Sequence, residues 1–263
     1  SLSNEPVAFF ELGKHRKTTM LFYAKKKGNS AATNFKVMIP GLDNDRIISG
    51  FKMWKKFYVQ ADSFGISIFN TSFAVLTTKG IEVRELDKLL PRSIPEIPAA
   101  PQSDLKKNDG YGRKSMDSSL SSLSLNSQVA VDLIRKLVNT SGTSKPMGMF
   151  KLANNSEFLL VYNTFALFTN KHGKLSRFLV IRFDFKARKI AFVQNNLFVA
   201  CEEVLEIWSI SDFVNGTNQL IQVVTGKDVS IISDGSDISI AVANPKVPGL
   251  QLVLELVPKE GKV

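Results

Sequence analysis

The fold of this chain is decided by residues 150–174, which read FKLANNSEFLLVYNTFALFTNKHGK. This stretch contains two short apolar runs, Glu157–Tyr162 and Phe165–Asn170, and Lys171-His172-Gly173 follows the second run. Short apolar runs bounded by Asn and Gly are typical of buried β-strands that are joined by tight turns. The stretch therefore predicts two neighbouring antiparallel strands.

The same pattern continues on both sides of this stretch. Towards the N-terminus we expect strands at 7–12, 18–24, 35–39, 56–60, 65–69, 73–77 and 81–85. Towards the C-terminus we expect them at 148–153 (before the quoted pair), 178–183, 189–193, 197–201, 205–210, 220–224, 238–243 and 251–257. Strands spaced at roughly 8–12 residues with turn signals between them favour a sandwich, a barrel or a propeller. A parallel α/β fold is disfavoured, because it needs a helix between successive strands.

One long segment interrupts the strands. Four prolines (91, 95, 98 and 101) begin it, and a serine-rich stretch with almost no aromatic residues follows. Such a composition cannot bury enough apolar surface to offset the entropy of ordering, so we predict a disordered insertion at 91–127. Directly after it, apolar residues recur at spacings of three and four, which predicts a short helix at 128–138.

The number of residues left for strands favours a propeller. Without residues 91–148, 205 of the 263 residues remain. At roughly 40–45 residues per four-stranded blade, they suffice for about five blades. A single sandwich of seven to nine strands is too small for them, although two sandwiches remain an alternative. We therefore predict an all-β chain, a β-propeller that forms a single domain at 5–257.

The composition excludes several classes of protein. The chain carries a formal net charge of +10 and one cysteine. A single cysteine excludes a disulfide scaffold and a cysteine-based metal cluster, and it suits a reducing compartment. No apolar run approaches the roughly 18 residues of a membrane-spanning helix, and residues 1–6 do not look like a secretory signal. We expect a soluble, basic protein inside the cell.

The residue types needed for catalysis are sparse. The two histidines, His15 and His172, stand in basic turns where we expect them to face water, and Cys201 ends an apolar run. Zinc-binding and phosphate-loop motifs are absent from the sequence. We therefore expect no enzymatic activity in this chain, no metal and no cofactor.

The excess positive charge concentrates in the predicted turns. It lies in Lys14–Lys17, Lys25–Lys27, Lys52–Lys56, Lys171–Arg177 and Lys186–Lys189. Turns of this kind are usually solvated surface, but together they could form a basic rim for an acidic protein or an anionic lipid. Nucleic acid ranks last as a partner, because the aromatic residues fall inside the strand patterns instead of beside the lysines.

Several collinear motifs resemble the citron homology (CNH) domain. The clearest are EFLLVY at 157–162 and FALFTNKHG at 165–173. Further segments agree in order: 14–25 with 35–37, 57–59 through 78–83, 197–200 with 205–208, and the predicted helix followed by Lys145-Pro146-Met147. The resemblance covers about 5–89 and 131–257, and it is strongest to the C-terminal CNH domain of fungal Rho-specific guanine nucleotide exchange factors.

This resemblance implies a fold and a role. CNH domains are seven-bladed β-propellers, so this chain would hold about five of the blades, without the opening ones. The implied role is a non-catalytic protein-interaction module that contacts a Rho-type GTPase or other signalling proteins. It would serve cell-wall integrity and polarity in the cytoplasm, with recruitment to the cell cortex. The exchange activity would belong to a separate domain of the parent protein.

Two other roles remain open from the sequence. The chain could be the CNH module of a kinase or of a vacuolar tethering protein. It could also be a membrane-surface module whose basic turns bind phosphoinositides. For the role as a protein-binding module, we expect the partner to contact the basic turn beside the best-matched motif, namely Lys171, His172, Lys174 and Arg177.

Overall fold

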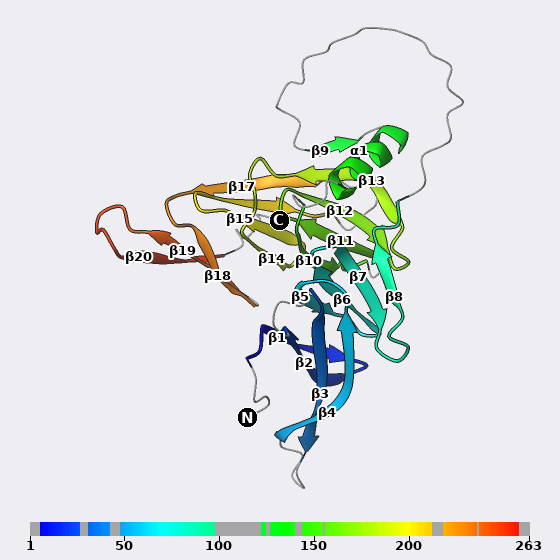
Figure 1. Cartoon of the computed structure of the whole chain (residues 1–263). Coiled ribbons are helices and arrows are strands. Elements are labelled where there is room, and N and C mark those ends of the chain that lie inside the picture. The colour runs from blue at the N-terminus through cyan, green and yellow to red at the C-terminus, as the bar shows by residue number, and fades with distance from the viewer. Residues whose placement is uncertain are drawn as a thin grey trace, which may run out of the picture. The chain divides into compact units, whose positions relative to one another are not determined.

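The computed structural model describes residues 6–26, 31–42, 48–97, 122–124, 127–139, 144–154, 156–211, 218–235 and 237–257. Its strands form five sheets that follow one another along the chain (Figure 1). The first two sheets have four strands each. They are β1 (Phe9–His15), β2 (Thr18–Lys26), β3 (Thr33–Leu42) and β4 (Ile48–Val59), then β5 (Ser63–Ile68), β6 (Ser72–Thr77), β7 (Gly80–Glu85) and β8 (Pro91–Ile94).

The strands of the remaining three sheets also pair in antiparallel fashion. The third has the order β10 (Pro146–Lys151), β11 (Glu157–Tyr162), β12 (Phe165–Asn170), β13 (Leu175–Arg182) and β9 (Ser122–Ser124). The fourth contains β14 (Lys189–Val193), β15 (Asn196–Ala200), β16 (Val204–Ser209) and β17 (Gln219–Thr225). The fifth contains β18 (Ser230–Asp234), β19 (Ile238–Ala243) and β20 (Gln251–Leu256).

Contacts within the chain define two compact units. The first comprises residues 1–95, 140–163 and 169–174, and the second comprises 96–139, 164–168 and 175–263. The first unit therefore holds the first two sheets together with β10 and β11. The second holds the fourth and fifth sheets, β13 and the helix.

The core of the first unit is built by aromatic side chains from its first two sheets. Alternate residues of a strand share one face, so Phe22 of β2 and Phe35 of β3 point to the same side as Phe57 of β4. Phe73 of β6 packs against them, with ring centroids 5.3 Å from Phe22 and 5.0 Å from Phe57. The rings of Phe35 and Phe57 are stacked, with centroids 4.8 Å apart. This aromatic cluster holds the first two sheets together.

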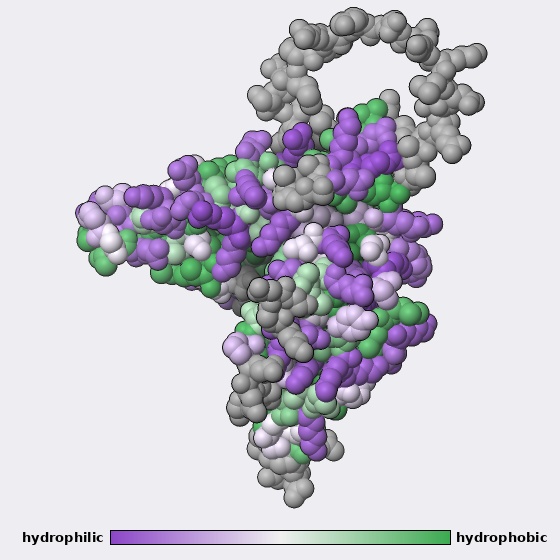
Figure 2. Space-filling model, viewed as in Figure 1, coloured by the Kyte–Doolittle hydropathy of each residue, from purple (hydrophilic) through white to green (hydrophobic). Residues whose placement is uncertain are grey.

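One core cluster of the second unit consists mainly of aliphatic side chains. Leu205 and Ile207 of β16 are buried against Ile238 and Ile240 of β19, and Phe198 of β15 completes the cluster. The outer strand of the fifth sheet is different, because Leu252, Val253 and Leu254 of β20 are exposed. Figure 2 shows the resulting hydrophobic surface at this sheet.

The helix α1 (Ser127–Asn139) confirms the prediction for 128–138. Ala130, Val131 and Ile134 are buried, while Val129 is exposed. The helix contacts β13. Its apolar residues therefore serve to pack it against the sheet.

The predicted disordered insertion at 91–127 is wrong at both of its ends. Pro91–Ile94 form β8, which pairs with β7, and Ser122–Ser124 form β9, which pairs with β13. Proline is compatible with β8 because it occupies the first residue of an edge strand, where no backbone donor is required. Residues 98–121 lie outside the described part of the chain.

Two further strands differ from their prediction. β4 begins at Ile48, whereas the sequence predicted a strand only from residue 56. The first half of β4 was missed because lysines stand among its apolar residues Phe51, Met53 and Phe57 and mask the pattern. β18 was not predicted, since Ser230–Asp234 is short and flanked by polar residues. The other predicted strands are present, with ends shifted by up to three residues.

A buried carboxyl in the fourth sheet leads to a prediction about pH. Glu206 is 6% exposed and accepts a hydrogen bond of 2.9 Å from the indole nitrogen of Trp208. Burial raises the pKa of Glu206 above its ordinary value of 4.5, and the bond from Trp208 opposes this only in part. The pKa of Glu206 is higher in the folded state than in the unfolded state. Ionisation of Glu206 therefore opposes folding at neutral pH but not below pH 4.5.

We therefore expect Glu206→Gln to raise the free energy of unfolding at pH 7 by about 1 kcal/mol, because glutamine keeps the acceptor without the charge. The gain should vanish near pH 4, where Glu206 is protonated in both states. Urea denaturation at the two pH values measures it. The exposed Glu203→Gln serves as the control, and an equal gain at both pH values would contradict the explanation.

Candidate interaction groove

A groove of about 620 Å³ lies in the first unit, where the turns at the ends of several strands meet. Its walls come from the β5–β6 turn, the β7–β8 connection, the facing ends of β10 and β11, and the turn that follows β12 (Figure 1). In an antiparallel sheet every second turn lies at the same end of the strands, so these connections lie at the same end of their sheets. The topology thus brings together residues that are far apart in sequence.

The charges around this groove are predominantly positive. Lys88, Arg92, Lys151 and Lys171 line it together with His172, whereas Glu85 is the carboxylate in the lining. Glu85 lies 3.6 Å from the ammonium of Lys88. The remaining three cations form no ion pair with a carboxylate in the described part of the chain, so the groove has a net positive charge.

The base of the groove is apolar. Phe69 and Phe158 both line it, and their rings pack edge to face with centroids 5.1 Å apart. Phe158 is buried and Val83 lies beside it in the lining. The lining of the groove therefore combines apolar rings with charged and polar side chains.

The turn that presents Lys171 and His172 is held by Asn170. The side-chain oxygen of Asn170 accepts hydrogen bonds from the backbone nitrogens of His172 (2.9 Å) and Lys174 (3.2 Å). The backbone carbonyl of Asn170 accepts a third bond of 2.9 Å from Gly173. Arg92 donates a bond of 3.0 Å to the carbonyl oxygen of Lys171. These bonds restrict the turn to one conformation and set Arg92 beside it.

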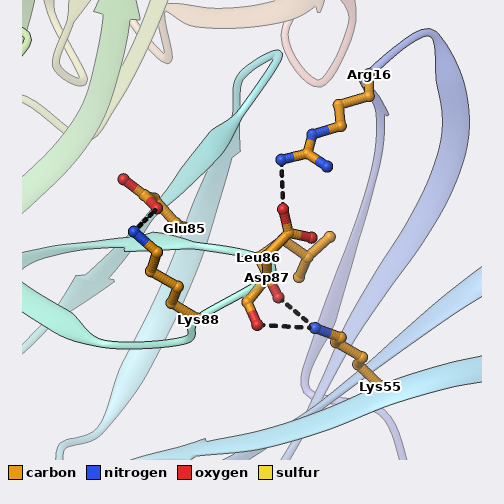
Figure 3. A network of polar contacts seen from close by, with 6 residues as sticks. All are labelled: Arg16, Lys55, Glu85, Leu86, Asp87 and Lys88. Atoms are coloured by element: carbon orange, nitrogen blue, oxygen red, sulfur yellow. Dashed lines mark hydrogen bonds and ion pairs between the residues drawn. The ribbon is translucent and has the colours of Figure 1, made fainter.

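The β7–β8 connection follows Glu85, the last residue of β7, and carries Lys88. It is anchored by the polar network in Figure 3. Lys55 of β4 donates to the carbonyl oxygens of Leu86 (2.7 Å) and Asp87 (3.2 Å). Arg16, in the β1–β2 turn, forms an ion pair with the carboxylate of Asp87. Two of the basic runs of the sequence therefore supply structural cations, and the run at Lys52–Lys56 lies in strand β4 instead of the predicted turn.

The four residues proposed from the sequence have three different environments. Lys171 and His172 line the groove, and Lys174 is exposed in the same turn. Arg177 is buried instead, 3% exposed. Its guanidinium lies 4.1 Å from the ring centroid of Phe168 and donates a bond of 2.8 Å to the carbonyl of Ser211. Arg177 therefore supports the fold of the second unit, and a partner cannot reach it at the surface.

The sequence analysis missed Lys88, Arg92 and Lys151 as members of this site. Each stands alone in its segment, and Arg92 falls in the stretch that was predicted to be disordered. The pairing of β8 with β7, together with the packing of β10 against β5 and β6, brings them to one groove. A run of lysines was therefore a poor guide to the positive surface.

Of the two histidines, His172 faces water as expected and His15 does not. His172 is exposed, but His15 ends β1 and is 2% exposed. Burial lowers the pKa of His15 from its ordinary value, so the ring is neutral at pH 7. Among the described residues, no three His, Cys, Asp or Glu side chains are grouped as metal ligands would be. The same residues contain no helix with the length and apolarity needed to cross a membrane.

Comparisons with known proteins agree with the resemblance found in the sequence. The family model of the CNH domain matches residues 3–235. A curated relative, Rho1 guanine nucleotide exchange factor 3 of Schizosaccharomyces pombe, is 24% identical over 275 residues, which cover 95% of this chain and 19% of that protein. The chain thus spans about a fifth of the length of this relative.

Solved structures support the fold. The AfRom2 CNH domain matches with a TM-score of 0.69 at 19% identity, covering 98% of this chain and 67% of the other. The β-propeller domain of Cps50 (Swd1) from Myceliophteria thermophila matches with a TM-score of 0.54 at 10% identity, covering 94% of this chain and 73% of the other. The predicted all-β propeller is confirmed, and the five sheets are its blades.

Proposed function

Because this chain belongs to the CNH domain family, we propose that it is the non-catalytic interaction module of a Rho guanine nucleotide exchange factor. The relationship to the Schizosaccharomyces pombe exchange factor supports this assignment. The partner is a Rho-type GTPase or another signalling protein with an acidic surface. Exchange activity resides in another part of the parent protein, and the module acts in the cytoplasm and at the cell cortex.

The observation that carries the proposal is the basic groove of the first unit. It joins Lys88, Arg92 and Lys151 to the turn that carries Lys171 and is fixed by Asn170. A rigid basic surface of this kind steers an acidic partner and fixes its orientation. Lys171, His172 and Lys174 are the residues that we assign to the contact, and Arg177 is not among them.

Charge reversal in the turn tests the contact. We expect Lys171→Glu/Lys174→Glu to weaken retention of a Rho-type GTPase by about tenfold, because two favourable charge contacts become repulsive. Both side chains are exposed, so the thermal unfolding of the variant should match that of the original protein. Pull-down and surface plasmon resonance with the GTPase in each nucleotide state measure the effect.

A matched control is available in the second unit. Lys227 and Lys246 are also exposed, so Lys227→Glu/Lys246→Glu makes the same change of net charge elsewhere. The control variant should retain the GTPase. Equal loss in both variants would mean that only net charge matters, and unchanged affinity in the turn variant would refute the assigned contact.

A further inference from the structure

The net positive charge of the groove also suits a second kind of ligand, besides the proposed protein partner. Lys88, Arg92, Lys151 and Lys171 bring four positive charges to a space of about 620 Å³, and Glu85 offsets one of them. Like charges held around one groove repel each other. A bound polyanion would relieve this repulsion.

The volume of the groove and the arrangement of its cations suit a compact ligand. A volume of about 620 Å³ falls within the range that is common for small-molecule sites. The cations come from three stretches of the chain, namely Lys88 to Arg92, Lys151 and Lys171, so a compact ligand with several charged groups can meet all of them. Asn70, Thr71 and Ser72 add neutral polar groups to the lining.

The mixture of one arginine and three lysines favours phosphate groups. A guanidinium can bind two phosphate oxygens at once, and an ammonium neutralises phosphate as a point charge. Arg92 is already oriented by its bond to the carbonyl of Lys171, which reduces the entropy lost when it binds. His172 lies beside it and adds a ring that can donate to phosphate.

From these observations we infer that the groove binds a compact ligand with several phosphate groups, such as an inositol polyphosphate or the headgroup of a phosphoinositide. This goes beyond the proposed contact with a GTPase and does not depend on it. The two sources share one chemistry, and a headgroup source would place the groove against a membrane.

The test measures binding of inositol 1,4,5-trisphosphate by isothermal titration calorimetry with the whole chain. Arg92→Gln/Lys151→Gln should weaken binding by about tenfold or more, because two charge-assisted contacts are lost. These two substitutions leave Lys171 and Lys174 in place. The control Lys227→Gln/Lys246→Gln makes the same change of net charge in the second unit and should bind normally.

A second variant works in the opposite direction. Glu85→Gln removes the carboxylate of the groove and should tighten binding by about twofold to fourfold. A folding defect cannot produce this gain. Glu85 is exposed, and its loss leaves Lys88 free to meet the ligand.

Vesicles identify the source of the phosphate. Phosphatidylcholine vesicles that contain phosphatidylinositol 4,5-bisphosphate are compared with phosphatidylserine vesicles of equal charge. Binding of the trisphosphate together with selective binding of the first vesicles supports a lipid headgroup, and binding of the trisphosphate alone supports a soluble ligand.

Three results would overturn the inference. They are no binding of the trisphosphate by the original chain, an equal loss in the groove variant and its control, or no gain in Glu85→Gln. Retention of the GTPase is measured in the same samples. If the GTPase is retained and the trisphosphate is not bound, the inference fails while the proposed function stands.

Discussion

Phe73→Ala is expected to lower the free energy of unfolding by about 4 kcal/mol, the size typical of an aromatic residue removed from a core. The side chain of Phe73 is fully buried between the rings of Phe22 and Phe57. Its removal leaves a cavity at the junction of the first two sheets, and the stacked pair Phe35 and Phe57 loses its neighbour. Urea denaturation followed by tryptophan fluorescence and circular dichroism measures the loss.

An exposed phenylalanine of the same unit provides the control. Phe10 is 65% exposed, so Phe10→Ala should change the free energy of unfolding by less than about 0.5 kcal/mol. A comparable loss in the two variants would contradict the assignment of the core to the cluster around Phe73. A small loss for Phe73→Ala would show that the first two sheets are not held together by this cluster.

Gly173→Ala is expected to cost about 3 kcal/mol, from two sources. Gly173 has a φ of +82°, a conformation that costs an alanine roughly 1–2 kcal/mol. A Cβ at this position would also lie 2.4 Å from the Cγ2 atom of the buried Ile94. Overpacking of this kind costs roughly a further 1–3 kcal/mol.

Another glycine separates these two sources. Gly249 has nearly the same φ, +84°, but a Cβ there would meet nothing within 4 Å. Gly249→Ala should therefore cost only about 1 kcal/mol. In Gly173→Ala/Ile94→Ala the clash is absent, so the two single losses should not add. Additive losses would show that Ile94 does not limit the site.

Gly173→Ala should also disturb ligand binding in the groove. The turn that presents Lys171 and His172 is closed by the bond from Gly173 to Asn170, and its conformation depends on the positive φ. Ile94 ends β8, the strand that also carries Arg92. A clash between Gly173 and Ile94 therefore disturbs both walls of the groove at once.

Strands with an uninterrupted apolar pattern could be predicted from the sequence. Glu157–Tyr162 and Phe165–Asn170 were found with their correct bounds, because both faces of these strands are buried and most of their positions are apolar. The helix was found for a similar reason, since a period of three and four is readable without knowledge of its neighbours. The propeller followed from the number of such strands and from the collinear family motifs.

Strands whose pattern is mixed could not be predicted. β8 begins with a proline and contains Arg92 and Ser93, so its strand character comes from pairing with β7 and not from its own residues. β4 is exposed along most of its length and is held by its pairing with β3. Pairing partners far along the chain decide such segments, and local composition carries no record of them.

The sequence alone determined that this chain is a set of short antiparallel strands with a basic surface and that it resembles the CNH domain, because periodicity, turn residues and net charge are local or additive properties. The tertiary structure decided which cations act together. Lys55, Arg16 and Arg177 came from the most conspicuous basic runs, yet they are used to hold backbone carbonyls, a carboxylate and an aromatic ring. Lys88, Arg92 and Lys151 are isolated in the sequence but share one groove. Proximity in space depends on which strands pair, and the pairing is set by the burial of side chains from distant segments.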